Sequence, residues 1–308
     1  MTIAVLSGGT SFEREVSLSS GRRVAEALRG RGHPVVTLDL SHELVGAVTD
    51  DAIDVVFLAL HGKAGEDGTI QRMLDLLGVA YTGSDATASA LAWDKSVSKG
   101  VLRRSGIATP DWQVLSAEAV REYGAGRALE RIAAALTFPL MVKPVQGGAS
   151  LGVRRVEVPG ELADAVMSAF NYHPAVLLER VVEGTEVAVS IVDGRALPAV
   201  EIHAKEGAYD FAARYTHGAT EFHVPARLDD ATAEASAAVA QGAWKILGCR
   251  HVMRADMIID PQGIPVVLEV DTCPGLTETS LLPLSARAAG IQFEALCEQL
   301  IDLARVAT

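Results

Sequence analysis

The sequence is poor in cysteine, in aromatic residues and in positive charge. Its 308 residues include three cysteines, Cys249, Cys273 and Cys297, which lie far apart and form no C-x-x-C pair. This excludes a disulfide framework and a thiolate zinc site. The formal net charge is -12, whereas nucleic-acid-binding proteins present basic faces. We therefore expect no nucleic-acid partner.

Long apolar runs are also missing. No stretch approaches the ~20 residues that cross a bilayer. The first residues, "MTIAVLSGGTS", have neither a basic segment nor a long apolar segment of the kind found in signal peptides. We therefore expect a soluble, cytoplasmic protein without a membrane partner.

The chain has enough apolar residues for more than one core, because 49% of it is hydrophobic and 21% is charged. A length of 308 residues favours two or three domains, which we expect at 1–93, 94–183 and 184–308. Strand-like and helix-like segments alternate in the first of these, which predicts a parallel sheet and an α/β (α+β) fold. Ligands of such sheets bind beyond the carboxyl ends of the strands, where "SGGTSFERE" and "LHGKAGEDG" fall.

The most informative segment is "VMRADMIIDPQGIPVVLEVD", which reads as a hairpin because two β-rich runs flank the turn 260–263. Glu269 and Asp271 are two positions apart and project from one face of the second strand. Folding back at the turn brings Asp256 opposite residue 268 or 269. Three carboxylates without a nearby His or Cys pair favour Mg²⁺, with Mn²⁺ as an alternative, and such a metal usually takes substrate phosphates as further ligands. The competing interpretation is one acid in the metal site and solvated charges for the rest.

A second candidate for phosphate binding is "KPVQGGASLGV", in which Lys143 ends a strand and a Gly-rich loop follows. Backbone N–H groups of such a loop, together with an ammonium, can hold phosphates. The P-loop pattern is missing, and an ordinary hairpin turn remains an alternative. Combined with the carboxylate hairpin, the loop predicts a nucleotide site. Cys273 has no obvious His base nearby, so we expect it to be a small apolar residue rather than a nucleophile.

Eight segments together resemble the D-alanine:D-alanine ligases of the ATP-grasp superfamily over nearly the whole chain. They are, in the family's order, "GGTSFEREVSL", "ALHGKAGEDGTIQ", "YTGSDATASALAWDK", "KPVQGGASLGV", "EVAVSIVDG", "YDFAARY", "RADMIID" and "EVDTCPGLTETSLLP". The resemblance implies a three-domain ATP-grasp fold with ATP between the central and C-terminal domains. It also implies a homodimer and an ADP-forming reaction, in which a carboxylate becomes an acylphosphate and an amine displaces the phosphate.

The resemblance assigns roles residue by residue. For ATP it implies Lys95 and Lys143 at the phosphates, with Ser150 in the loop over them, Glu179 and the Val182 backbone at the adenine, and Glu186 at the ribose. For two Mg²⁺ ions it implies Asp256, Glu269 and Asp271. For the acylphosphate and the tetrahedral intermediate it implies Arg254 and the Gly275 backbone N–H. For the amino acids it implies Glu13 at the first ammonium, Ser280 with Leu281 at the second carboxylate, and His61, Ser150, Arg214 and Tyr215 around them.

Six of the residues to which the resemblance assigns a role also have a simpler structural explanation. Glu13 could stabilise a first helical turn, Ser280 could be an ordinary N-cap, and His61 a buried strand-end histidine. Lys95 could be a solvated helix residue, and Arg214 and Tyr215 surface residues of a strand.

The chain departs from the family pattern at three places. Asp271 stands where the family usually has Asn, which adds one negative charge. In the loop of Gly147, Gly148, Ala149 and Ser150, Ala149 replaces a serine that links the first-substrate acid to the tyrosine matching Tyr215. Arg214 replaces a common Lys, which is not a conservative change. We therefore expect D-alanine alone to be a poor substrate and a D-amino acid with a longer polar side chain to be a better one.

Three functions stay open at this point. The first is a ligase of the D-alanine:D-alanine type, serving peptidoglycan synthesis. The second is a relative that closes an internal amide, as in D-cycloserine formation. The third is a nucleotide-binding protein without ligase activity, although a mere binding protein has no need of an acylphosphate stabiliser such as Arg254. A depsipeptide-forming ligase is less favoured, because Tyr215 matches the dipeptide-forming members.

Overall fold

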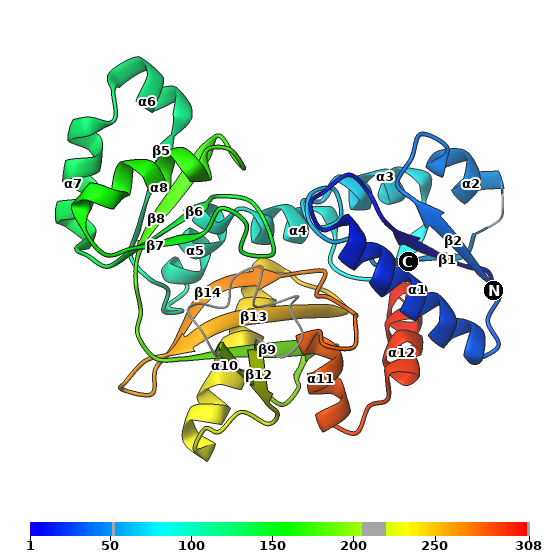
Figure 1. Cartoon of the computed structure of the whole chain (residues 1–308). Helices are drawn as coiled ribbons and strands as arrows, with labels where there is room; N and C mark the ends of the chain where they lie inside the picture. The colour runs from blue at the N-terminus through cyan, green and yellow to red at the C-terminus, as the bar shows by residue number, and fades with distance from the viewer. Residues whose placement is uncertain (51–52, 205–219, 307–308) are drawn as a thin grey trace.

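The computed structural model describes residues 1–50, 53–204 and 220–306, and it contains three β-sheets. The sheets use consecutive parts of the chain, within residues 3–81, 112–180 and 185–271. Figure 1 shows the first sheet on the right, the second at the upper left and the third below them in the middle. One sheet therefore lies in each of the three predicted segments.

The first sheet is parallel, with the strand order β2-β1-β3-β4. The strands are β1 (Ile3–Ser7), β2 (Val35–Asp39), β3 (Val55–Leu58) and β4 (Ala80–Tyr81). The connecting helices are α1 (Arg14–Gly30), α2 (Leu44–Asp50) and α3 (Thr69–Leu77). β1 and β3 are buried along their whole length, as expected for central strands covered on both faces. The predicted parallel sheet is confirmed.

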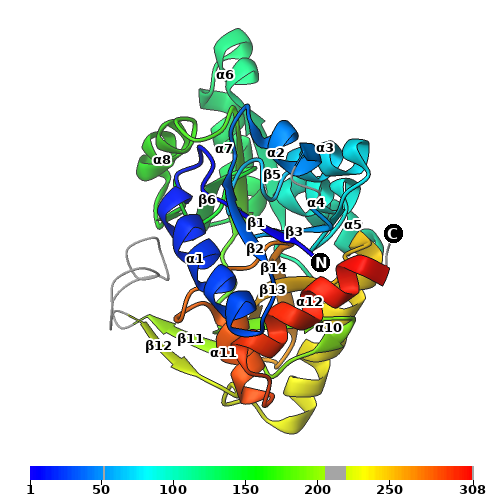
Figure 2. The same ribbon diagram turned by 90° about the vertical axis from the view of Figure 1, so that its right-hand side faces the viewer.

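One face of this sheet is covered by helices from opposite ends of the chain. α12 (Phe293–Val306) lies beside α1, as Figure 2 shows at the front of the molecule. Leu296, Leu300 and Ile301 of α12 share a core with Val24 and Leu28 of α1. The last helix therefore packs on the first sheet, although it follows the third sheet in sequence.

The second sheet is antiparallel, with the order β5-β8-β6-β7. Its strands are β5 (Trp112–Ser116), β6 (Leu140–Pro144), β7 (Arg154–Val156) and β8 (Ala175–Arg180). Its helices are α6 (Ala117–Tyr123), α7 (Gly126–Leu136) and α8 (Leu162–Ala169), with a 3₁₀ turn at Pro159–Glu161. β6 and β7 flank the Gly-rich loop, as predicted.

The third sheet contains the predicted carboxylate hairpin and has the order β12-β11-β9-β13-β14. Its strands are β9 (Thr185–Val192), β10 (Arg195–Ala196), β11 (Val200–Ala204), β12 (Thr220–His223), β13 (Val252–Ile259) and β14 (Pro265–Asp271), with β10 paired to β9. The turn is closed by Gly263, whose N–H donates to the Asp260 carbonyl at 2.9 Å. Asp256 pairs with Glu269, and Arg254 with Asp271, so the predicted register is confirmed.

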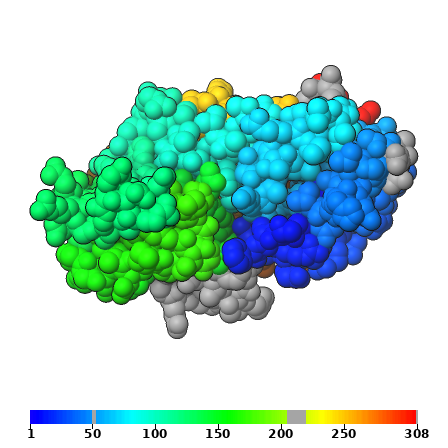
Figure 3. All heavy atoms as spheres, turned by 90° about the horizontal axis from the view of Figure 1, so that it is seen from above, coloured from blue at the N-terminus to red at the C-terminus, as the bar shows by residue number. Residues whose placement is uncertain are grey.

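Two short helices connect the first sheet to the rest of the molecule. α4 (Ala86–Trp93) and α5 (Lys95–Arg104) pack on β14 and, with α10 (Asp230–Leu247), cover the third sheet. Asp85 caps α4 and Asp94 caps α5, since each carboxylate accepts from two backbone N–H groups. Seen from above, this cyan segment lies between the green and blue ends of an elongated molecule (Figure 3). In the described ranges no helix is long and apolar enough to span a membrane.

Candidate active site

Two adjoining pockets lie where the three sheets meet. They share Lys95, Gly147, Gly148 and Glu269. One pocket lies toward the second sheet and the face of the carboxylate hairpin. The other lies toward the first sheet and the turn after β14. The two predicted ligand regions are therefore connected.

The pocket beside the second sheet is built around Glu179, a fully buried acid on β8. Lys143 of β6 forms an ion pair with Glu179 Oε1, and Lys99 Nζ of α5 lies 2.9 Å from Oε2. Burial would raise the pKa of Glu179, but the two ammonium groups outweigh it and hold that pKa below the usual value. A carboxylate oxygen has two acceptor positions, so Oε2 can accept a further hydrogen bond beside Lys99. This acceptor can take a donor from a ligand.

The remaining predicted nucleotide residues line the same pocket. Val182 and Glu186 line it with Glu179, and so does Ser150, which lies in the loop between β6 and β7. Met141 and Leu268 form an apolar part of the wall of this pocket. This apolar wall beside the buried Glu179 suits a flat heterocycle.

The sequence alone does not predict that Lys99 pairs with Glu179. Lys99 is 1% exposed, and its ammonium also donates to Thr109 Oγ1 at 2.7 Å. Burial is the main reason why the pKa of Lys99 falls to about 8. The only signal in the sequence is its position four residues after Lys95 on one helix face. That pattern is also typical of a solvated face.

The three acids of the hairpin are neutralised by cations of the protein itself. Arg254 binds Asp256 through Nε and Nη2, at 2.6 and 2.8 Å, and its Nη1 lies 3.0 Å from Asp271. Lys95 Nζ lies 3.1 Å from Glu269 and donates to the Gly147 carbonyl. Among the described residues no three Asp, Glu, His or Cys side chains are gathered to hold a metal ion. The predicted three-acid metal cluster is therefore not assembled in this conformation.

Lys95 and Arg254 are both buried, so the idea that Lys95 is a solvated helix residue is wrong. Burial alone would lower the pKa of Arg254, but Asp256 and Asp271 raise it well above the usual value. The guanidinium is thus a permanent positive charge that lines the second pocket.

The second pocket contains Glu13 and Glu66, from the loops that follow β1 and β3. Glu13 stands at the start of α1, yet its side chain makes no capping bond, so helix capping does not explain it. Glu66 accepts from the Gly62 N–H at 2.7 Å. Burial, with Asp271 and Glu13 nearby, raises the pKa of Glu66 well above its usual range.

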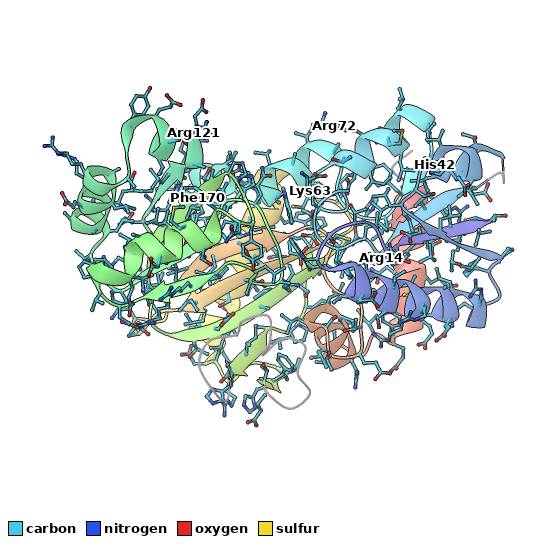
Figure 4. The ribbon with its side chains drawn as sticks, turned by 45° about the horizontal axis from the view of Figure 1, so that its top comes forward. Arg14, His42, Lys63, Arg72, Arg121 and Phe170 are labelled. Carbon is cyan, nitrogen blue, oxygen red and sulfur yellow. The ribbon has the colours of Figure 1, made fainter. Side chains whose placement is uncertain are left out.

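Two charged residues mark the outer ends of these loops. Figure 4 labels Lys63, which is exposed between His61 and Glu66, and Arg14 at the first turn of α1. Arg14 Nη2 binds Asp39 at 2.6 Å. This ion pair joins the first turn of α1 to the end of β2. It therefore helps to hold the neighbouring residue Glu13 in place.

His61 has both ring nitrogens occupied. Nδ1 lies 3.1 Å from the Cys273 carbonyl, which only accepts, so Nδ1 carries the proton. Nε2 then accepts from the Ser20 hydroxyl at 2.9 Å. Burial lowers the pKa of His61, which keeps the ring neutral. The simpler explanation for this residue, a satisfied buried histidine, agrees with the structure.

Ser280 is not an ordinary N-cap. It precedes α11 (Leu281–Ala288), but its side chain makes no bond to that helix. Its Oγ accepts from the Thr277 N–H at 3.0 Å and contacts the Thr277 hydroxyl at 2.7 Å. Gly275 lies beside it, and both residues, with Leu281, line the second pocket.

Cys273 is a buried thiol whose Sγ lies 3.7 Å from the Leu58 carbonyl. Burial raises its pKa well above the usual value, so it is not a nucleophile, as expected. Arg214 and Tyr215 lie outside the described residues.

The fold and the pockets together define a class of protein. A buried Lys–Glu pocket beside a Gly-rich loop, joined to a second pocket across a carboxylate hairpin, is the arrangement of an ATP-grasp ligase. Comparison with known proteins identifies the family. Residues 41–84 match the model described as D-ala D-ala ligase N-terminus, and residues 101–302 match D-ala D-ala ligase C-terminus. The chain belongs to the D-alanine–D-alanine ligase family of ATP-dependent ligases.

Relatives agree over the whole length. A D-alanine–D-alanine ligase of Anaeromyxobacter sp. (strain Fw109-5) is 44% identical over 302 residues, which cover 97% of this chain and 96% of the relative. The crystal structure of the D-alanine–D-alanine ligase from Bacillus anthracis is 36% identical, with a TM-score of 0.87 and coverage of 100% and 98%. The same enzyme complexed with ATP has a TM-score of 0.86 at 36% identity, with coverage of 100% and 97%.

Proposed function

We propose that this protein joins two D-alanine molecules at the expense of ATP, releasing ADP and phosphate. The observation that carries the proposal is the junction of the two pockets at Lys95, Gly147, Gly148 and Glu269. At this junction a phosphoryl group bound in one pocket would meet a carboxylate bound in the other. The ATP complex of the relative from Bacillus anthracis supports the nucleotide.

ATP would occupy the pocket of Glu179. Its exocyclic amine would donate to Glu179 Oε2, which can accept a second hydrogen bond beside Lys99, and the Val182 backbone and Glu186 would hold adenine and ribose. Lys143, Lys95 and the loop with Ser150 would hold the phosphates.

The hairpin acids would hold Mg²⁺, with Mn²⁺ as a substitute. Asp256 and Glu269 border the ATP pocket, and a Mg²⁺ site commonly needs only one or two carboxylates with phosphates as further ligands. Lys95 on Glu269 and Arg254 on Asp271 now supply the positive charge that the acids require. Bound Mg²⁺ would neutralise negative charge on the phosphoryl group in transfer.

The residues of this chain would then guide two transfers. Glu13 would bind the ammonium of the first D-alanine, whose carboxylate oxygen attacks the γ-phosphorus and displaces ADP. Ser280 and Leu281 would hold the carboxylate of the second D-alanine. Its amine attacks the acyl carbon, loses a proton, and phosphate departs. Arg254 and the Gly275 N–H would stabilise the acylphosphate and the tetrahedral oxyanion.

The substrate is the finer part of the proposal. The names of the relatives favour intermolecular coupling of D-alanine over closure of an internal amide, and over mere nucleotide binding. The expectation that D-alanine is a poor substrate rests on Ala149, which lines the amino-acid pocket without a hydroxyl. It stays a prediction, and Ala149→Ser tests it.

Three broader features belong to the same proposal. The domains would be 1–93, 94–183 and 184–308, one for each sheet. Resemblance to the family supports a homodimer and a cytoplasmic location, and mass measurement in solution tests the former.

The test is incubation with Mg-ATP and D-amino acids, given singly and in pairs, while phosphate and nucleotide products are followed. We expect ADP, phosphate and D-alanyl-D-alanine in equal amounts. AMP and pyrophosphate would exclude the acylphosphate route. Rapid synthesis from D-alanine alone at sub-millimolar concentration would show that Ala149 does not weaken the pocket. Slow synthesis accelerated by Ala149→Ser would show that the missing hydroxyl limits the reaction.

A further inference from the structure

The turn between β14 and α11 carries much of the amino-acid pocket without regular secondary structure of its own. The residues of this turn that line the pocket include Thr272, Cys273, Gly275, Thr277 and Ser280. Turns of this kind need bonds from neighbouring elements, because unpaired buried backbone groups are costly. The bonds come from the first sheet and its helix α1.

Leu276 is the point of attachment. Its N–H donates to Ser20 Oγ at 3.3 Å, and its carbonyl accepts from Arg23 Nη1 at 2.7 Å. Ser20 and Arg23 are three residues apart and so lie on one face of α1. The N–H and the carbonyl of Leu276, the residue after Gly275, are thus both held by α1, a helix that packs on the first sheet.

Ser20 is itself fixed. It is fully buried, and its hydroxyl donates to Nε2 of His61, whose Nδ1 donates to the Cys273 carbonyl. The two ends of the segment 273–276 are therefore tied to α1 and to the end of β3. The neutral histidine in this chain binds the turn and has no nitrogen free for substrate.

Arg23 is fixed from its other side by α12. Its guanidinium carbon lies 3.6 Å from the centre of the Phe293 ring, a stacking geometry that arginine adopts better than lysine. Figure 2 shows α1 and α12 side by side, with α11 below them. The side chain therefore links three elements: α1, α12 and the turn.

We propose that Arg23 is a positioning residue for the ligase reaction, holding the turn 273–280 so that Gly275 and Ser280 meet the second amino acid. Arg23 does not line either pocket and acts only through the Leu276 carbonyl. Gly275 and Ser280 are close enough for a small shift to matter, because a Cβ on Gly275 would lie 2.7 Å from Ser280 Oγ. The inference rests on the proposed function for the roles of those two residues.

The experiment compares Arg23→Met, which keeps an apolar stem against Phe293 but loses the donor, with Arg23→Lys and wild type. Arg22→Met is the matched control, because Arg22 is an exposed neighbour on the same helix. We measure the KM for the D-alanine that supplies the amine, the KM for ATP, and the amount of ADP formed per dipeptide.

For Arg23→Met we expect roughly a 10-fold rise in that D-alanine KM, the scale of one lost charged hydrogen bond. We also expect more than one ADP per dipeptide, since an acylphosphate that is not captured by an amine is hydrolysed. The KM for ATP should stay unchanged, and Arg23→Lys should recover part of the loss. If the role of Arg23 were purely structural, Arg23→Met would lower the fraction of active enzyme without changing either KM or the ratio of ADP to dipeptide. If Arg23→Met has the same KM values and the same ratio of ADP to dipeptide as Arg22→Met, or differs only in its fraction of active enzyme, the proposal is wrong.

Amide hydrogen exchange separates this proposal from the proposed function. Arg23→Met should speed exchange in a peptide covering 273–280 and leave β1 unchanged, whether or not the protein makes dipeptide. A wild-type protein that makes no dipeptide would refute the function. Unchanged exchange at 273–280 would refute the positioning role.

Discussion

Gly148 lies so close to Glu13 that a Cβ atom at position 148 would stand 2.2 Å from Glu13 Oε1. The two residues come from different sheets: Gly148 from the loop between β6 and β7, and Glu13 from the loop after β1. The glycine is needed for space alone, since its φ is not in the left-handed region. The Gly-rich loop therefore lies against the proposed ammonium site as well as the proposed phosphate site.

We expect Gly148→Ala to displace either the loop or the Glu13 carboxylate. Because Glu13 would bind the first D-alanine, its KM should rise at least ~10-fold, the scale of a lost charge-assisted bond. Steady-state kinetics at saturating ATP measure this change. Gly160→Ala is the matched control, because nothing lies within 4 Å of a Cβ there. Equal kinetics of the two variants would contradict the close packing.

Much of the hairpin could be predicted from the sequence, because its signals are local. The turn residues 260–263 set the pairing as far as Met257, and alternation puts Glu269 and Asp271 on one face. A one-residue register shift between Met257 and Asp256 then pairs Asp256 with Glu269, and the turn alone does not predict that shift. The partners of those acids could not be predicted by the same means. Arg254 is two residues from Asp256 and looked like an oxyanion stabiliser alone, yet it also neutralises both Asp256 and Asp271.

Residues that act across sheets were the ones missed. Lys99 and Arg23 meet their partners Glu179 and Leu276 only after the sheets have packed, at sequence separations that no local pattern encodes. Glu66 lies in the predicted ligand-binding loop "LHGKAGEDG", but only its burial near Glu13 and Asp271 in the folded protein shows that its pKa is raised. The site residues 214 and 215 remain predictions.

Glu269→Gln should reduce phosphate release at least ~10²-fold, because it removes a charge that would face the transferring phosphoryl group. It also removes the carboxylate that Lys95 pairs with. Asp271→Asn, which restores the residue usual in the family, should be tolerated far better, since its remaining oxygen can still accept from the Cys273 N–H. Both are measured as ADP formation under saturating Mg-ATP and D-alanine. Near wild-type activity of Glu269→Gln would mean that the metal site is elsewhere.

Glu179→Gln should destabilise the fold by roughly 3–5 kcal/mol, because it leaves the buried ammonium groups of Lys99 and Lys143 without their anion. Chemical denaturation at neutral pH measures the loss. Glu183→Gln is the control: it breaks a solvent-exposed pair with Arg155 and should change stability by less than about 1 kcal/mol. Similar midpoints for both variants would show that the buried cluster contributes no net stability.

His251 should make the fold sensitive to acid. Its Nδ1 accepts from the Gly83 N–H at 3.1 Å, which ties β13 to the end of β4, and protonation of Nδ1 breaks that bond. Burial, reinforced by Arg250 and opposed by Asp193, lowers its pKa to about 4. The unfolded chain therefore takes up the proton first. The stability from neutral His251 is complete above about pH 6.5 and is lost as the pH falls toward 4, by at most about 1.4 kcal/mol per pH unit.

His251→Asn tests this pH dependence. Asparagine tolerates the φ of +57° at this position and offers an oxygen to Gly83, but it does not titrate. Denaturation midpoints between pH 7 and 4.5 should fall less steeply for this variant than for wild type. His61, whose pKa is also lowered, contributes equally to both proteins and cancels in the comparison. His42→Asn, at an exposed histidine, should keep the wild-type slope (Figure 4). Parallel curves for wild type and His251→Asn would mean that protonation of His251 is not coupled to unfolding.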